Sequence, residues 1–92
     1  MSAYIVIELT LRDAAARDRY SAGSRPILQE FGGEVVAAGP WQVLHGEPGF
    51  VTGVLIAFKD RDTALAFYNA PAYQALTNDR EAGFDSRFQV IG

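Results

Sequence analysis

Two side chains of this sequence have the chemistry needed to move a proton. His45 is the single histidine of the chain, and histidine is the residue type that changes its charge close to neutral pH. Glu8 lies within an apolar stretch, where an enclosed carboxyl group could act as a catalytic acid or base. The alternative is that His45 is a solvated turn residue and that Glu8 pairs with an Arg or Lys at a rim.

Three aromatic side chains are candidates for contacting a small organic ligand. Trp41 is the single tryptophan and lies close to His45 in the sequence, so it could wall a pocket or stack on a planar molecule. Tyr20 and Tyr68 could shape the same pocket. The alternative for Trp41 is packing in the core or in a dimer interface. The alternative for the tyrosines, Tyr73 included, is core packing with hydroxyl groups that reach an edge.

Arginine could supply the charge that holds an acidic ligand. Arg80 and Arg87 each carry a planar guanidinium group, which can bind a carboxylate through two parallel hydrogen bonds. The alternative for Arg80 is a structural ion pair with Asp79, Asp85 or another acidic side chain near a helix end. The candidate ligand-binding residues are therefore Trp41, Tyr20, Tyr68 and Arg80.

Composition excludes several other kinds of site. The 92 residues contain no cysteine, so disulfides, thiolate nucleophiles and Cys-ligated clusters are impossible. A single histidine also excludes a two-His metal site within one chain, and we expect neither a metal nor a cofactor. Eight basic and 11 acidic residues give a net charge of -3, which argues against nucleic-acid binding. The sequence has no Gly-rich phosphate loop and no GxSxG nucleophile motif.

The N-terminal residues carry no signal for secretion or membrane insertion. They have no basic region, and Glu8 interrupts the apolar run that follows Met1. Such a run is too short for a signal peptide or a membrane span. We therefore expect a cytoplasmic protein that does not bind membranes.

Alternation of side chains with a period of two predicts four β-strands. The first covers residues 3–11, with one fully apolar face and one mixed face that carries Glu8. The third is apolar on both faces and should be central in the sheet. After a bend at Gly39-Pro40, the second strand could resume over residues 41–44. The predicted strands cover residues 3–11, 34–38, 50–58 and 86–91.

Helical spacing and capping residues predict the elements between these strands. Asp13 is a suitable N-cap for a first helix that ends at Gly32-Gly33. We expect a kink or break around residues 23–26, because Pro26 cannot donate its amide hydrogen. Asp60 caps a second helix over residues 61–69, and Pro71 begins a further turn or short helix that runs to about residue 80.

The resulting order, β-α-β-β-α-β, predicts an α+β protein of ferredoxin-like architecture in one domain over residues 1–92. Its four-stranded antiparallel sheet would carry both helices on one face. The other face, with Tyr4, Val6 and Glu8, is too apolar to leave in water as one patch. We therefore expect a homodimer in which two sheets pack face to face. The alternative is a monomer with one hydrated sheet face.

The C-terminal third resembles a known family signature. The run FYNAPAYQAL at residues 67–76, followed by Arg80 and Ser86-Arg87, is similar to the domain-of-unknown-function family number thirteen-thirty, within the dimeric α/β-barrel superfamily. Tyr20, Gly32-Gly33 and the two long apolar strands also fit, so the resemblance spans nearly the whole chain. It implies a ferredoxin-like homodimer. The wider superfamily includes cofactor-free monooxygenases, isomerases and small-ligand binders.

Four positions depart from the usual pattern of that family. Glu34 stands where a basic residue commonly follows the Gly-Gly pair, and Ala38 stands where an Arg is usual. His45 replaces an acidic residue before the hairpin glycine, and Phe67 takes the place of a frequent Trp. If the polar positions among these form a family site, this chain has rebuilt it, so no activity is carried over.

The sequence leaves three hypotheses for function. The first is a small homodimer that binds a small organic molecule in an apolar cleft, and that could be a cofactor-free enzyme using His45 or Glu8 for proton transfer. The second is a non-catalytic ligand-binding or stress-associated module. The third is a purely structural dimer. Convergence of His45, Trp41 and Glu8 in one cavity would favour the enzyme.

Overall fold

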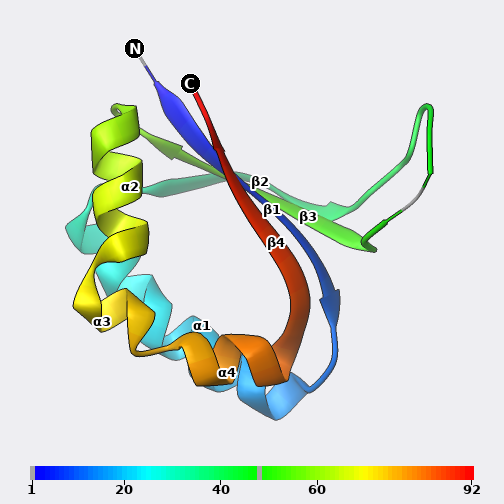
Figure 1. Ribbon diagram of the computed structural model, residues 1–92, viewed down its shortest axis with the longest axis horizontal. Helices are drawn as coiled ribbons and strands as arrows, with labels where there is room; N and C mark the ends of the chain where they lie inside the picture. Colours follow the sequence, from blue (N-terminus) through cyan, green and yellow to red (C-terminus); the bar gives the residue numbers. More distant parts are fainter. Residues whose placement is uncertain (1, 48) are drawn as a thin grey trace.

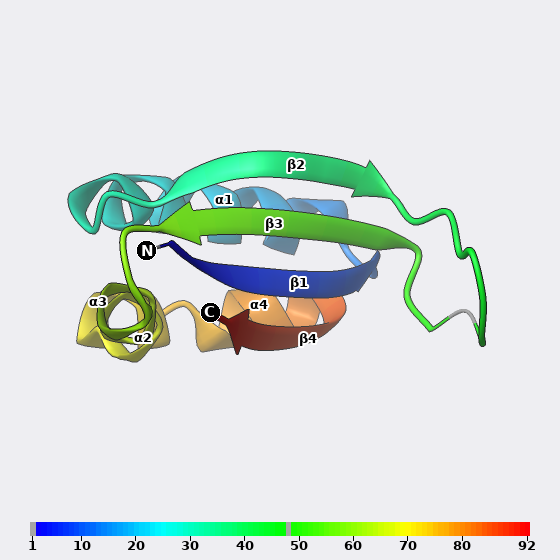
Figure 2. The ribbon, with the colours of Figure 1, turned by 90° about the horizontal axis from the view of Figure 1, so that it is seen from above.

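The chain forms one antiparallel sheet with a layer of helices on one side (Figures 1 and 2). The computed structural model describes residues 2–47 and 49–92. The strand order in the sheet is β2-β3-β1-β4, and each neighbouring pair is antiparallel. The chain therefore has the predicted ferredoxin-like architecture. In chain order the elements are β1 (Ala3–Leu11), α1 (Ala14–Glu30), β2 (Glu34–Pro40), β3 (Thr52–Phe58), α2 (Arg61–Asn69), α3 (Pro71–Gln74), α4 (Thr77–Gly83) and β4 (Phe84–Ile91).

The alternation of β1 decides what each side of the sheet faces. Ile5 pairs with Ile56 of β3 and with Val90 of β4, and directly opposed residues share a sheet face. Ile5 and Ile56 are buried in the core, so this is the inner face, which the helices cover. The intervening residues, such as Val6 and Leu55, form the outer face. β1 and β3 are both central strands, as predicted for β3.

The core lies between the inner face and the helices, and aromatic rings fill much of it. Phe67 is 3% exposed and packs its ring against Phe31, Phe58 and Tyr73 at centroid separations of 4.8–6.2 Å. Aromatic pairs at such separations contribute beyond the area that they bury. The buried core cluster consists of Ile5, Ile7, Ile56, Phe58, Ala64, Phe67 and Tyr73.

The structure shows no helix break near Pro26, where the sequence predicts a kink or break. Helix α1 is assigned without interruption from Ala14 to Glu30, with Pro26 inside it. Proline in a helix interior removes one backbone hydrogen bond. The adjoining Ile27 and Leu28 pack against the core cluster, so tertiary contacts offset this local cost. The helix ends at Glu30 with Phe31 as its C-cap, and Gly32 adopts the positive φ of 71° that favours glycine.

Other boundaries also differ from the predictions. The second strand runs on to Pro40, where it pairs with Thr52, and residues 41–44 form no strand. The third strand begins at Thr52 rather than at residue 50. The helix predicted from Pro71 to about residue 80 consists of two short helices, α3 and α4. The last strand begins at Phe84, two residues earlier than predicted.

The connection between β2 and β3 projects beyond the end of the sheet (Figure 2). We call its described residues, 41–47 and 49–51, the arm. Several large apolar side chains of the arm are exposed, and Leu44 is 90% exposed. The arm therefore presents apolar surface that one chain does not cover. In the residues described, no helix is long and apolar enough to span a bilayer.

Candidate functional site

A buried arginine lies at the centre of the most polar part of the core. Arg80, on α4, is 9% exposed. Its nearest carboxylate is that of Glu81, 3.6 Å from Nη2, and the Glu81 side chain is 69% exposed. Its Nη1 instead donates to the hydroxyl oxygens of Tyr68, at 3.2 Å, and Tyr73, at 3.4 Å. Phenol oxygens therefore replace the usual buried carboxylate partner of an arginine.

Three aromatic rings surround the Arg80 guanidinium. Its Cζ atom lies 5.0 Å from the ring centroid of Phe88, 5.6 Å from that of Tyr68 and 5.9 Å from that of Tyr73. A cation within about 6 Å of an aromatic centroid is attracted by the ring's electrons, with an energy that grows as water is excluded. We refer to Arg80, Tyr20, Tyr68, Tyr73 and Phe88 as the Arg80 cluster.

Tyr20 and Tyr73 of the cluster are held in the neutral form. Tyr20 and Tyr73 share a hydrogen bond of 2.6 Å between their hydroxyl oxygens. Burial, reinforced by the neighbouring Tyr73, raises the pKa of Tyr20 well above its usual value. Burial also raises the pKa of Tyr73, against the opposing effect of its hydrogen bonds to Tyr20 and Arg80. Both phenols therefore keep their protons at neutral pH and can donate hydrogen bonds.

The hydrogen bonds to Tyr68 and Tyr73 also favour the positively charged form of Arg80. Burial alone lowers the pKa of a guanidinium, but the hydrogen bonds to Tyr73 and Tyr68 outweigh it and raise the pKa of Arg80. A guanidinium is charged throughout the physiological pH range in any case. The cluster thus holds one fixed positive charge beside the neutral hydroxyl groups of Tyr20 and Tyr73.

Each member of the cluster comes from a different element, and close helix packing brings them together. Tyr20 lies on α1, Tyr68 on α2, Tyr73 on α3, Arg80 on α4 and Phe88 on β4. Gly83 ends α4 where a Cβ atom would lie only 2.8 Å from the backbone nitrogen of Arg17. The Gly83 carbonyl also accepts hydrogen bonds from the amides of residues 12 and 13. A glycine here lets α4 and α1 approach closely enough to assemble the cluster.

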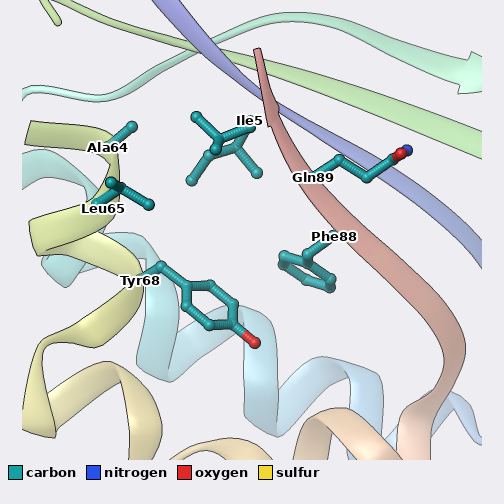
Figure 3. Close-up of a pocket in the computed structure, with 7 residues that line it drawn as sticks. Ile5, Ala64, Leu65, Tyr68, Phe88 and Gln89 are labelled. Atoms are coloured by element: carbon teal, nitrogen blue, oxygen red, sulfur yellow. The ribbon is translucent and has the colours of Figure 1, made fainter. Parts of the chain in front are cut away.

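Two apolar cavities border the cluster. The first lies between α2 and β4, has a volume of about 180 Å³, and is lined by Tyr68, Leu65 and Phe88 among others (Figure 3). The second lies between α1 and the sheet, has a volume of about 270 Å³, and is lined by Tyr20 and Phe88 among others. Phe88 belongs to both linings, so its ring stands between the two cavities.

The outer face holds a separate group of predicted residues. Trp41 covers Gly53 so closely that a Cβ atom at residue 53 would overlap the indole ring. Glu8 accepts a hydrogen bond of 2.9 Å from Gln89 and lies 3.7 Å from the Nε atom of Arg87. Trp41 and Glu8 line one shallow cavity of about 150 Å³. Arg87 thus contacts Glu8 rather than the Arg80 cluster.

His45 joins neither group. It is exposed in the arm, and it does not line any of the four cavities described in this structure. Glu47 lines the shallow cavity beside Glu8. Among residues 2–47 and 49–92, no group of three or more His, Cys, Asp or Glu side chains could hold a metal ion.

The six candidate residues therefore lie in three separate places in the structure. Tyr20, Tyr68 and Arg80 meet in one cluster, Trp41 and Glu8 share the outer face, and His45 stands apart. The polar role of Tyr73 was missed, because its spacing predicts only a core aromatic residue. Asp79, considered as a partner of Arg80, instead pairs with Arg19 at 3.1 Å.

The fold and this cluster define the class of the protein, a ferredoxin-like α+β domain with a cleft between its sheet and helices. Residues 2–92 match the family described as Domain of unknown function (DUF1330), and the chain belongs to this family. This agrees with the resemblance seen in the sequence. No curated protein sequence matches the chain.

Solved structures with the same fold include proteins of known and unknown function. RPA0582, a protein of unknown function from Rhodopseudomonas palustris, aligns with a TM-score of 0.79 and 20% identity over 98% of this chain and 80% of that chain. SnoaB, a cofactor-independent oxygenase from Streptomyces nogalater, aligns with a TM-score of 0.69 and 13% identity over 99% and 91%.

A third structure is described as a dimer. This ferredoxin-like protein of unknown function from Jannaschia sp. CCS1 aligns with a TM-score of 0.63 and 16% identity, over 100% of this chain and 99% of that chain. At identities of this size the three likenesses concern the fold.

Proposed function

We propose that this protein binds a small, mostly apolar organic ligand in the cleft between α2 and β4, beside the Arg80 cluster. The observation that carries the proposal is the apolar cavity whose lining includes the Tyr68 ring, with the Tyr68 hydroxyl held by a buried arginine. Ligand sites typically combine apolar walls with a few fixed polar groups. A cavity of about 150 Å³ is known to hold one benzene molecule, so about 180 Å³ suits a single six-membered ring.

A titration with a neutral single-ring probe tests this proposal. We expect 4-fluorobenzamide to bind saturably to the full chain in ¹⁹F NMR, and to shift the amide signals of Ile5, Tyr68 and Val90, which line the cavity. Leu65 is 38% exposed and lies in the same lining, so Leu65→Trp should fill the mouth and weaken binding at least tenfold. Leu11→Trp, at an exposed position on β1, is the matched control. Shifts confined to the outer face would contradict the proposal.

We also propose that two copies pair through the outer faces of their sheets. Several large apolar side chains of the outer face and the arm are exposed, including Trp41 at 44%. A groove of about 420 Å³ runs beside Trp41 and is lined by Val6 and Leu55. One chain leaves this apolar surface uncovered, and the similar protein from Jannaschia is described as dimeric. An isologous pairing would cover the same patch on both copies.

Light scattering after size-exclusion chromatography tests the pairing. The wild-type chain should run as a 20 kDa species, twice its mass of 10.0 kDa. Leu55→Asp should produce the single chain, because a carboxylate would be buried in the interface. Ala66→Asp, on the exposed surface of α2, should leave the dimer intact. Circular dichroism confirms that each variant is folded, and a wild-type mass of one chain would rule out the pairing.

A cofactor-free enzyme acting on the same ligand is the second candidate. The fold shared with a cofactor-independent oxygenase supports it. The cavity beside Tyr68 has no imidazole or carboxylate in its described lining. The two candidate bases, His45 in the arm and Glu8 on the outer face, lie outside this lining. Turnover that is unchanged in His45→Ala and in Glu8→Gln would exclude both residues from that role.

A further inference from the structure

We propose a second ligand site in the cavity between α1 and the sheet, which takes a molecule with an apolar body and one carboxylate group. The apolar body would lie against the inner face of the sheet, and the carboxylate would lie at the mouth of the cavity beside Arg25. This site is distinct from the cavity between α2 and β4 and goes beyond the function proposed above. The polar side chains of α1 that line the cavity carry the inference.

Helix α1 turns a largely polar face toward the sheet. Residues 21, 24, 25 and 28 line the cavity, and their spacing of three and four residues places them on one face of the helix. A helix normally presents an apolar stripe to the core that it covers. Three of these four residues are Ser21, Ser24 and Arg25, and Leu28 is the apolar one. Apolar side chains would have served packing better, so this face indicates a site for a ligand that carries a polar group.

The opposite wall of the same cavity is apolar. Ile7 and Leu9 of β1 line it together with Val54 of β3, and Phe84 and Phe88 line it from β4. A cavity of about 150 Å³ holds one benzene molecule, so about 270 Å³ accommodates a six-membered ring with one further group at each end. The two walls therefore differ in polarity, as the two parts of an amphipathic ligand do.

Arg25 stands at the mouth of this cavity. It belongs to the lining and is exposed to solvent. Val35, on the edge strand β2, also lines the cavity and is 51% exposed. The mouth therefore lies between α1 and β2, and α1 lies beneath the β2 side of the sheet (Figure 2). A carboxylate at this opening would stay partly hydrated while the apolar body lies inside, so the cost of burying a charge is avoided.

The charges around the mouth favour an anion. Arg25 is the single charged residue in the described lining of the cavity. A guanidinium can bind a carboxylate through two parallel hydrogen bonds. The ion pairs found among residues 2–47 and 49–92 belong to other arginines, namely Arg17, Arg19, Arg80 and Arg87.

A matched pair of probes tests the inference on the full, ¹⁵N-labelled chain at pH 7. 4-Ethylbenzoate and 4-ethylbenzamide have nearly the same shape, but only the first is anionic. Affinities are measured from the amide signals of Leu9, Ser24 and Val54, which line this cavity and not the one between α2 and β4. We expect about fivefold tighter binding of the benzoate, the size of one partly exposed ion pair.

Two charge-removing variants show whether Arg25 is the source of the preference. Arg25→Gln should abolish the preference for the benzoate and leave benzamide binding within twofold. Lys59→Gln removes the same charge at an exposed position outside the cavity and should leave the preference intact. A preference that survives in Arg25→Gln would overturn the role of Arg25, and equal binding of both probes to the wild type would refute the acidic ligand.

A cavity-filling variant tests the position of the site. Ser24→Leu should occupy the space between α1 and the sheet and weaken both probes at least tenfold. Gln29→Leu, at an exposed position of the same helix, should weaken neither, and circular dichroism checks that both variants are folded. Unchanged binding in Ser24→Leu would contradict the site. Shifts confined to Ile5, Tyr68 and Val90 would also refute the second site, but they would leave the proposed function standing, so the two proposals fail separately.

Discussion

The two faces of the sheet handle their reactive side chains in opposite ways. On the inner face, the Arg80 guanidinium and the hydroxyl groups of Tyr20, Tyr68 and Tyr73 are linked by hydrogen bonds within one chain, and Arg80 is buried. On the outer face, Trp41 and Glu8 remain partly exposed. The comparison teaches that a residue with suitable chemistry forms a site only where other elements close around it. The inner face meets that condition in a single copy.

The largest difference between the core under the inner face and the arm should appear in the free energy of unfolding. Phe67→Ala should lower the free energy of unfolding by about 3–5 kcal/mol, because a fully packed ring leaves a cavity. Leu44→Ala in the arm should change it by less than about 0.5 kcal/mol, since the side chain is 90% exposed and makes few contacts. Urea denaturation of the dissociated Leu55→Asp background measures both without a contribution from pairing. A cost at Leu44 as large as that at Phe67 would show that the arm packs onto its own chain.

The next largest effect should be on ligand affinity when the Phe88 ring, which separates the two inner cavities, is removed. At about 180 and 270 Å³, each cavity alone is smaller than the ~300 Å³ at which typical ligand pockets begin. Phe88→Ala should join them and increase the affinity for 2-naphthoate at least tenfold, with a stability cost of about 2–3 kcal/mol because the ring is only partly buried. Phe50→Ala, outside the inner cavities, is the control for fluorescence titrations. Unchanged naphthoate binding would mean that the cavities stay separate without the ring.

A pH titration should distinguish the buried phenols of the inner face. The pKa of Tyr20 is raised in the folded chain, whereas an unfolded tyrosine titrates near pH 10. Above about pH 10 the unfolded chain therefore loses a proton that the folded chain keeps, and stability falls by about 1.4 kcal/mol per pH unit for each such group. Tyr20→Phe should reduce this slope, as measured by urea midpoints between pH 9 and pH 11. A slope equal to that of the wild type would contradict the buried, neutral state of Tyr20.

The smallest effect should come from His45. His45→Ala is expected to change stability by less than about 0.5 kcal/mol, because the side chain is exposed in the arm. Binding of 4-fluorobenzamide should also be unchanged. A clear loss of binding would show that His45 contributes to the cleft between α2 and β4. The arm of a second copy would then have to bring it there.

The sequence was sufficient for the sheet but less so for the connections. Alternation over residues 3–11 predicts β1 with its observed bounds, because one face of a central strand must be apolar. The helix break considered at Pro26 is absent, since local propensity cannot include the packing of Ile27 and Leu28 on the core. The stretch 41–44 looks like a strand, yet pairing ends at Pro40 and Thr52, where the chain leaves the sheet.

The candidate site was predicted by residue type but not by arrangement. Tyr68 and Arg80 were visible as a tyrosine and an arginine in one family-like run. Their contact depends on the turn between α3 and α4 and on Gly83, which no periodicity reveals. His45, Trp41 and Glu8 are suited to chemistry by type, but their placement depends on whether the outer face is enclosed. One chain does not enclose it.

The adjacent ends of the chain offer a way to redraw its connectivity. Tyr4 pairs with Ile91, so the start of β1 and the end of β4 lie side by side (Figure 1). A short linker could join them, and new ends could be opened in the arm at Gly46. Such a circular permutant would keep every strand pairing and the whole Arg80 cluster, because exposed loop tips tolerate new termini. It would cut only the arm, and so would report whether self-association depends on an unbroken arm.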